Sequence, residues 1–359
     1  MTASFLTGPV SVRNEVRMAF CAPPVSHRTP EFLAMMRRTR DSLASLVNAA
    51  HVTLMVGSGT LANDAVGAQI RGFGEFGLIL SNGEFGERLI DHANRWGLQF
   101  AVERQPRGHA FDWSQVCARA QRARPAWIWA VLTETSTGVA NPLTRLRDLA
   151  RQSGADLCLD AVSAVGLMPV NLDGIRFATA VSGKGLAAMP GIAAVFHDGR
   201  LAAPQAVPRY LDLATYEAAD GVPFTHSSNL LAALECAVTS TRWADKFARV
   251  RRQTFELRAA LRAHGLAPLA RDADAAPGVV TLPLGDEVRA ADVAHALLES
   301  GIEVAWQSRY LQERNWLQIA LMGEVDEDAV RRLPGALANL LTPQPVISGL
   351  TACSHSPSG

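Results

Sequence analysis

The chain has 359 residues, of which 48% are hydrophobic and 19% charged, and its formal net charge is zero. This composition can supply a large buried core and two domains, and the balanced charge excludes the basic surface of a typical nucleic-acid-binding protein. The five cysteines lack the CxxC spacing of a zinc site, and no apolar run reaches the roughly 18 residues that cross a bilayer. We therefore expect a soluble, cytoplasmic protein that binds no metal, no nucleic acid and no membrane.

The chain begins with an N-terminal arm, residues 1–20, and a capped helix. The arm predicts an extended segment around Gly8 and a short amphipathic helix. Thr29 is then well placed to cap the next helix. His27 and Arg28 lie just before this helix start, where they form either an exposed polar turn or an imidazole and a cation for an anionic substrate.

A strand, a glycine turn and a helix follow at positions 51–70. The turn GSGT, positions 57–60, combines a flexible backbone with two hydroxyls, and the first helical N–H groups can hold a phosphate at the positive end of the helix dipole. The same stretch also fits the G-x-G-x-x-A pattern of a dinucleotide site. That alternative requires an acidic residue at the end of the next strand, where the sequence has Ser81 and Asn82.

The chain then alternates between apolar strands and amphipathic helices. Phe85 lies between two glycines, before a helix predicted over Glu87–Trp96, and its ring can stack on a flat ligand or cap the core. Thr135 lies in a hydroxyl-rich turn after the strand Trp127–Leu132, a position that suits either a cofactor oxygen or an ordinary turn. The repeated units predict an α/β domain with a mostly parallel sheet, covered on both faces, at residues 21–230.

Two side chains in this domain carry the functional interpretation. Lys184 follows the apolar strand Phe177–Val181, and Asp160 ends an equally apolar strand upstream. Ligands of open α/β sheets bind outside the carboxyl ends of the strands, so both side chains should face one crevice. Such a lysine can form a Schiff base with pyridoxal 5′-phosphate (PLP), while the carboxylate keeps the pyridine nitrogen protonated. Taken singly, the lysine could be a solvated loop residue and the aspartate a helix cap; the small residues around Lys184 and the phosphate-type turn favour PLP.

The last third of the chain predicts a smaller α+β domain, residues 231–342. Thr225 lies in a polar turn that precedes one long helix or two abutting helices over Asn229–His264. A β–α–β–β pattern and a closing helix follow. The tail, residues 343–359, is rich in serine and proline, and we predict that it is disordered.

A set of motifs, in family order, resembles the class V aminotransferases of the PLP-dependent fold type I superfamily. The resemblance runs from about residue 6 to Leu341 and rests on LTGPVSV, SHRTPEF, GSGTLAND, NGEFGER, ETSTGV, LCLDAVSAVG, SGKGLAAMPG and IALMG. The chain is similar to alanine–glyoxylate, serine–glyoxylate and 2-aminoethylphosphonate–pyruvate transaminases. Each motif is short, and their common order makes the resemblance specific.

The resemblance implies a role for each matching residue. Lys184 would be the Schiff-base lysine, and Asp160 would pair with the pyridinium. The implied cofactor-binding set is completed by Ser58, Gly59, Thr60, Phe85, Thr135 and Thr225. Thr225 would reach the cofactor of the other subunit, so that the active site lies at the interface of a homodimer. The implied substrate-binding residues are Gly8, His27, Arg28 and Gln318.

Gln318 departs from the family pattern. The transaminases that the chain resembles carry an arginine at this position, which pairs with the acid group of the substrate, and a glutamine cannot form that charged, bidentate contact. Either another cation holds the acid group or the favoured amine lacks an α-carboxylate. The candidate cations are Arg28, Arg309 and Arg314, and we prefer Arg28 because its SHR segment resembles that of phosphoserine aminotransferases.

We therefore expect a transaminase that moves an amino group from a small amine or amino acid to a keto acid or aldehyde. Lys184 would act as general base and acid, and the kinetics would be ping-pong. The alternative is a PLP-dependent lyase, desulfurase or decarboxylase, which Gln318 keeps open, although no cysteine lies in a convincing loop near the site for a desulfurase. A binding protein without turnover is the third hypothesis, and the presence of both Lys184 and Asp160 argues against it.

Overall fold

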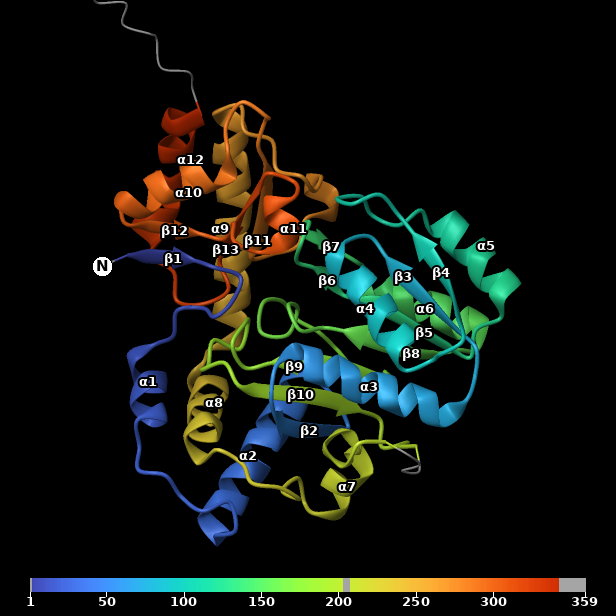
Figure 1. Ribbon diagram of the computed structural model, residues 1–359. Coiled ribbons are helices and arrows are strands. Elements are labelled where there is room, and N and C mark those ends of the chain that lie inside the picture. Colours follow the sequence, from blue (N-terminus) through green and yellow to red (C-terminus); the bar gives the residue numbers. More distant parts are fainter. Residues whose placement is uncertain (1, 203–206, 342–359) are drawn as a thin grey trace, which may run out of the picture.

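A seven-stranded sheet forms the centre of the structure (Figure 1). The computed structural model describes residues 2–202 and 207–341. The strands lie in the order β2-β10-β9-β8-β5-β3-β4, and all run parallel except β10, which is antiparallel to both its neighbours. Their bounds are β2 His51–Val56, β3 Gly77–Ser81, β4 Phe100–Arg104, β5 Trp127–Val131, β8 Asp156–Asp160, β9 Phe177–Val181 and β10 Ile192–His197. This arrangement confirms the predicted α/β fold with a mostly parallel sheet.

Helices cover both faces of this sheet, as predicted. On β5, Ile128 and Ala130 pack into the core beneath α2, α5, α6 and α8, while Trp127 and Trp129 pack beneath α3, α4 and α7. Each large apolar side chain buried in this way contributes roughly 1.5–3 kcal/mol. Because neither face meets water, the strands are continuous apolar runs rather than alternating ones. The helices are α2 Pro30–Val47, α3 Gly59–Phe73, α4 Glu84–Arg95, α5 Trp113–Ala123, α6 Leu143–Ser153, α7 Leu213–Ala218 and α8 Ser228–Ser240.

Two helix starts show what local sequence can and cannot specify. The hydroxyl oxygen of Thr29 accepts a hydrogen bond from the N–H of Phe32, so α2 begins at the predicted cap. By contrast, α4 begins at Glu84, earlier than predicted, and Phe85 lies in its first turn rather than in a loop. The cap of α4 comes from a distant element, because the buried Glu134 carboxylate accepts the N–H of Phe85 at 3.3 Å.

A second, smaller core lies beside the sheet and includes the N-terminal strand. β1 pairs in parallel with β12, and β11 pairs antiparallel with β13. The β–α–β–β order of this part was predicted, whereas the pairing of β1 was not, because a three-residue strand has no usable periodicity. The remaining elements are β1 Ala3–Phe5, α1 Asn14–Phe20, β6 Thr133–Glu134, β7 Val139–Ala140, α9 Trp243–Ala263, β11 Val279–Pro283, α10 Ala290–Glu299, β12 Ile302–Val304, α11 Arg309–Gln312, β13 Trp316–Ala320 and α12 Glu327–Leu341, with short 3-10 turns at Arg209–Leu211 and Asp272–Asp274.

We propose a division into two domains, with the boundary in the turn at residues 241–242. The predicted segment 229–264 forms two helices, α8 and α9. Leu231 and Leu234 of α8 lie in the core of the large sheet, which favours a boundary after α8 rather than at residue 230. The predicted disordered tail, residues 343–359, lies outside the described residues. Within the described ranges, none of the helices has both the length and the apolar composition to span a membrane.

The loops after β8 and β9 pack backbone against backbone beside Lys184. Gly166 has φ +83°, and a Cβ built on it would lie 2.4 Å from the carbonyl carbon of Gly185. Both the positive φ and the close approach require glycine at position 166. This contact fixes the two loops that carry Asp160 and Lys184 relative to each other.

We expect Gly166→Ala to lower the melting temperature much more than Gly154→Ala does. Gly154 also has a positive φ, +64°, but a Cβ there meets nothing within 4 Å, so the control costs only the conformational strain of about 1 kcal/mol. At Gly166 the same strain is joined by a clash with rigid backbone atoms. Thermal unfolding measures both variants, and equal shifts would show that the loops do not constrain each other.

Candidate active site

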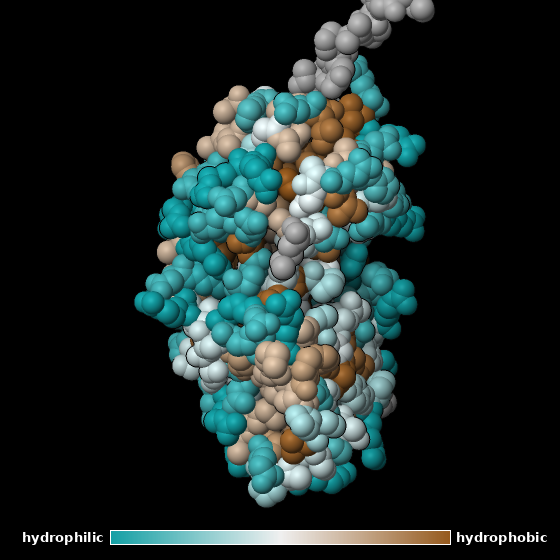
Figure 2. Space-filling view, turned by 90° about the vertical axis from the view of Figure 1, so that its left-hand side faces the viewer, coloured by the Kyte–Doolittle hydropathy of each residue, from teal (hydrophilic) through white to brown (hydrophobic). Residues whose placement is uncertain are grey.

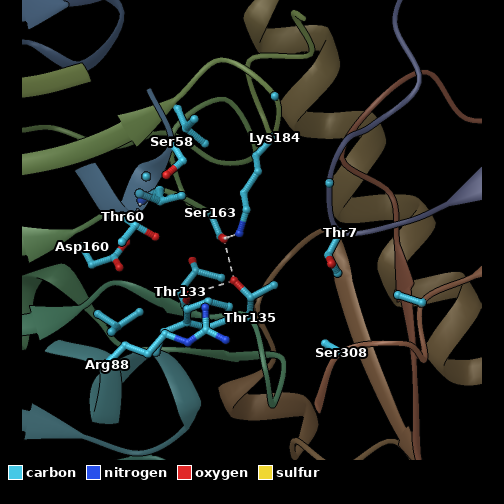
Figure 3. A pocket seen from close by; sticks show the side chains of 18 of the residues that line it. Thr7, Ser58, Thr60, Arg88, Thr133, Thr135, Asp160, Ser163, Lys184 and Ser308 are labelled. Carbon is cyan, nitrogen blue, oxygen red and sulfur yellow. Dashed lines mark hydrogen bonds between the residues drawn. The ribbon is translucent and has the colours of Figure 1, made fainter. Parts of the chain in front are cut away.

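A cavity of about 540 Å³ opens at the edge of the sheet where the parallel strands end (Figure 3). It is lined by residues that follow β2, β5, β8 and β9 and by residues 6–9 of the N-terminal arm. The smaller part contributes Ala305, Gln307, Ser308, Tyr310 and Leu311. Its volume lies in the range of small-molecule sites. The parallel direction of the strands therefore gathers side chains from distant parts of the sequence in one place.

Lys184 projects into this cavity from the loop after β9 (Figure 3). Its Nζ donates a hydrogen bond to the Ser163 hydroxyl at 2.9 Å, and the Thr135 hydroxyl donates to the same oxygen at 2.5 Å. Burial lowers the pKa of Lys184; the Asp160 carboxylate opposes this effect, and Arg88 adds to it. A larger fraction of the amine is therefore in the neutral, nucleophilic form than in an exposed lysine.

Asp160 lines the same cavity at the end of β8 and is only 6% exposed. Its carboxylate accepts hydrogen bonds from the Asn63 amide at 2.9 Å and from the N–H of Val162 at 3.0 Å. The Thr179 hydroxyl donates to the amide oxygen of Asn63, which fixes the orientation of that amide. Asp160 is therefore a fixed buried acceptor, and the structure brings it and Lys184 to one cavity.

The N-terminus of α3 offers free hydrogen-bond donors to the cavity. Ser58 occupies the N-cap position, but its hydroxyl makes no capping bond. The first backbone bond of the helix runs from the N–H of Ala62 to the carbonyl of Ser58, so the N–H groups of Gly59 and Thr60 find no acceptor in the described part of the chain. A Cβ on Gly59 would approach the Val162 side chain to 3.0 Å, so only glycine leaves this end of the cavity open. These donors form a typical phosphate site.

Phe85 supplies an aromatic wall. Its ring centre lies 5.2 Å from the Nζ of Lys184 and 6.3 Å from the ring of Tyr310, which meets it edge-on. Glu134 holds this first turn of α4 through the N–H groups of Phe85 and Gly86. Burial raises the pKa of Glu134, although a hydrogen bond from Ser136 and the backbone bonds act in the opposite direction.

The predicted substrate-binding residues are spread over several places. Gly8 lines the cavity, and a Cβ on it would lie 3.6 Å from the Cγ of Lys184. Gln318 is fully buried on β13 and does not line the cavity. His27, Arg28 and Thr225 lie outside the cavity of their own chain, and the last two are exposed.

The arginines named as alternatives to Gln318 also lie outside the cavity. Arg309 pairs with Glu313 at 2.6 Å and is 91% exposed. Arg314 donates to the carbonyl of Tyr310 and lies 3.9 Å from Glu313.

Several cavity residues were missed from the sequence, among them Thr133, Ser163, Arg88 and Tyr310. Arg88 follows Phe85 by three positions, so the helical spacing could have placed it on the same face of α4. Thr133 and Ser163 had no signal beyond their position after a strand. Tyr310 lies on a short helix that no periodicity predicts.

Lys246 supports the loop of Lys184 from α9. Its Nζ donates to the carbonyl of Gly185, and its side chain lies over the ring of Trp243. It is 8% exposed, and burial, aided by Arg249, lowers the pKa of Lys246 to about 8. The chain contains only these two lysines, so amine chemistry on its side chains has two targets.

A crevice with an amine, a fixed carboxylate and a phosphate-type helix terminus at the carboxyl edge of a parallel sheet defines a PLP-binding enzyme of the α/β class. The family described as Aminotransferase class-V matches residues 21–204. The chain belongs to this family, and it is a PLP-dependent aminotransferase.

Individual relatives and solved structures are similar to this chain over most of its length. The soluble hydrogenase 42 kDa subunit of Anabaena cylindrica is 30% identical over 323 residues, which cover 84% of this chain and 82% of the relative. L-aspartate–glyoxylate aminotransferase of Paracoccus denitrificans (strain Pd 1222) is 28% identical over 281 residues, 73% and 71% of the two chains. The crystal structure of alanine–glyoxylate aminotransferase from Nostoc sp. superimposes with a TM-score of 0.85 at 28% identity, covering 95% and 96%. The lyase alternative is not favoured, because aminotransferases recur in both comparisons.

The described residues fit this cofactor. The free N–H groups at the start of α3 suit its phosphate, and the fixed Asp160 carboxylate suits a protonated pyridine nitrogen. The hydroxyl of Thr133, which lines the cavity, is buried and has no partner in the described chain, so it remains available to a ligand oxygen. Each polar feature of PLP thus has a group that can meet it.

The depressed pKa of Lys246 predicts a pH-dependent stability. The folded chain releases the Lys246 proton at about pH 8, whereas an unfolded lysine keeps it to about 10.5. Between these values the unfolded chain binds more protons, so stability rises with pH, by up to about 3 kcal/mol over the whole window. We expect Lys246→Met to remove the part of this rise that Lys246 causes, while the part caused by the lowered pKa of Lys184 remains. Melting temperatures of both proteins from pH 7.5 to 10 test it, and parallel curves would contradict it.

Proposed function

We propose that Lys184 binds PLP covalently and that the enzyme transfers the amino group of a small amine or amino acid to a small keto acid or aldehyde by a ping-pong mechanism. The observation that carries this proposal is the buried Lys184 amine, with its lowered pKa, in one cavity with the fixed Asp160 carboxylate. When bound, PLP serves as an electron sink for the substrate carbon.

Four residues that line the cavity would each have a separate role in binding or catalysis. Asp160 would keep a proton on the ring nitrogen, because hydrogen bonds from Asn63 and the backbone of Val162 fix its carboxylate in place. Phe85 would stack on the flat ring, and Thr135 would lie near the ring oxygen once its hydroxyl is released from Ser163. Lys184, once released, accepts and returns the proton of the substrate carbon, which its lowered pKa favours.

The names of related proteins support a small keto acid as the amino acceptor. The relative from Paracoccus denitrificans is named for glyoxylate, as is the solved structure from Nostoc sp.. A further relative, 2-aminoethylphosphonate–pyruvate transaminase of Pseudomonas fluorescens (strain Pf0-1), is 33% identical over 166 residues, 44% of each chain, and is named for pyruvate. We propose that the acceptor here is of this class.

We also propose a homodimer in which Thr225 and the His27–Arg28 segment reach the partner's site. Figure 2 shows apolar side chains gathered on the face that carries α1. Met18 is 63% exposed, and Phe20 and Val25 are also exposed. This surface adjoins the Thr225 turn, because the N–H of Val25 donates to the Ser228 hydroxyl at 2.9 Å. An apolar surface beside exposed site residues is what a shared active site requires.

A cytoplasmic location completes the proposal. Cys21, Cys117, Cys158 and Cys236 are free thiols, and the cysteines of the described ranges form no disulfide. Reduced cysteines are typical of a reducing compartment.

We expect the wild-type protein to show a visible absorption band with PLP that an amino donor shifts to the near ultraviolet and a keto acid restores. In Lys184→Ala turnover should fall by about 100- to 10,000-fold, because the general base is lost. Arg309→Gln, which changes an exposed arginine outside the cavity, serves as the control. Wild-type turnover in Lys184→Ala would refute the assignment. Release of ammonia or carbon dioxide without the shifted band would indicate a lyase.

We expect Thr225→Val to weaken PLP binding by about tenfold, because one hydrogen bond to the charged phosphate is lost. The exposed Thr144→Val on α6 is the matched control. A second test concerns the interface itself. Sedimentation velocity should show a wild-type dimer, and Met18→Asp should dissociate this dimer, because a charge then replaces an apolar contact residue. A monomer that binds PLP with wild-type affinity would contradict the shared site.

A further inference from the structure

Within its own chain, the cavity is lined by none of the arginines predicted to bind the acid group of the substrate. Gln318 occupies the position where the transaminases that the chain resembles carry an arginine. Its amide donates to the carbonyl of Thr135 and to the Thr281 hydroxyl, and it accepts from the Tyr310 hydroxyl at 2.7 Å. This end of the site is therefore closed by a neutral network whose hydrogen bonds are already satisfied within the protein.

Arg88 lines the cavity from α4, whereas Gln318 lies on β13. Its guanidinium carbon lies 4.9 Å from the centre of the Phe85 ring, and the Nζ of Lys184 lies 5.2 Å from the same point. Figure 3 shows the Arg88 side chain directed toward Thr133 and Thr135, on the other side of the cavity from the phosphate-type turn at Ser58. Among the described residues, no other arginine lines the cavity.

The guanidinium retains free donors. Its one ion pair joins Nε to the Glu84 carboxylate at 3.6 Å, and the Arg88 side chain is 51% exposed. The two terminal nitrogens donate no hydrogen bond within the described chain, so a planar carboxylate can meet them in a bidentate pair. An arginine with a purely structural role would use these donors in hydrogen bonds to protein acceptors. Arg258, which is 3% exposed, donates in this way to Asp272 and to the carbonyl of Ala270.

We propose that Arg88 binds the carboxylate of the substrate, so that the enzyme acts on α-amino acids and 2-oxo acids and disfavours amines and aldehydes that lack an acid group. This inference rests on the proposed function of the cavity. Arg88 lies on α4, where Glu134 and Phe85 fix the turn that carries it. Gln318 left two alternatives open, another cation or a substrate without a carboxylate, and we favour the other cation.

Kinetics with two amino acceptors test the proposal. Pyruvate carries the carboxylate and acetaldehyde does not. For Arg88→Gln we expect kcat/KM for pyruvate to fall by about 10- to 100-fold, mainly through KM, and kcat/KM for acetaldehyde to change less than about twofold. Arg88→Lys should recover part of the loss, because charge returns without the planar fork. Arg95→Gln is the control, because Arg95 is an exposed arginine on the same helix that does not line the cavity. An Arg88→Gln enzyme that matches this control with pyruvate would overturn the proposal.

A binding measurement separates this inference from the proposed function. Calorimetric titration of PLP-free protein with maleate, in phosphate buffer to occupy the donors at α3, needs no turnover. We expect maleate to bind the wild type and Arg95→Gln equally and Arg88→Gln at least about tenfold more weakly. If transamination fails but this difference is found, the anion site stands and only the proposed function falls. Equal binding by all three proteins would overturn the assignment of Arg88 whatever the activity.

Discussion

The shared direction of β2, β5, β8 and β9 is the constraint on which the site depends. Their carboxyl ends meet at one edge of the sheet, so the phosphate-type turn, the Thr133–Thr135 turn, Asp160 and Lys184 converge although they span more than 120 positions of the chain. The contact between Gly166 and Gly185 then holds the last two loops together. Without the parallel order, the same residues would lie at opposite edges of the sheet.

Burial gives the side chains gathered at this edge their chemical properties. Desolvation lowers the pKa of Lys184, while hydrogen bonds hold the Asp160 carboxylate in place. The same low-dielectric setting makes Glu134 an effective cap for α4, and that helix carries both the aromatic wall and the cation Arg88. Glu134, a buried carboxyl that does not line the cavity, thus determines where two cavity side chains lie.

Much of this could be predicted from the sequence because the signals are local. Apolar runs predicted the parallel strands, Thr29 predicted the start of α2, and the positions of Asp160 and Lys184 after strands placed them at one edge. The predicted start of α4 was wrong, because the residue that caps this helix, Glu134, is distant in sequence. The pairing of β1 was likewise missed, because it too depends on a contact between remote segments.

The site shows the same limit. Gln318 could be recognised as a departure from the family, but its three hydrogen bonds depend on Thr135, Thr281 and Tyr310, which only the folded chain brings together. Arg88 stood in a quoted motif and was overlooked, because nothing local shows whether an arginine on a helix meets a cavity or solvent. Tertiary contacts, rather than residue type, separate these cases.

Borohydride reduction of the PLP-loaded protein, followed by peptide mapping, tests the central claim most directly. Reduction fixes the cofactor on the lysine that holds it, and the chain offers only Lys184 and Lys246. Our account predicts that the label lies on the peptide containing Lys184. A label on Lys246, or none on either lysine under conditions in which PLP is bound, would contradict it.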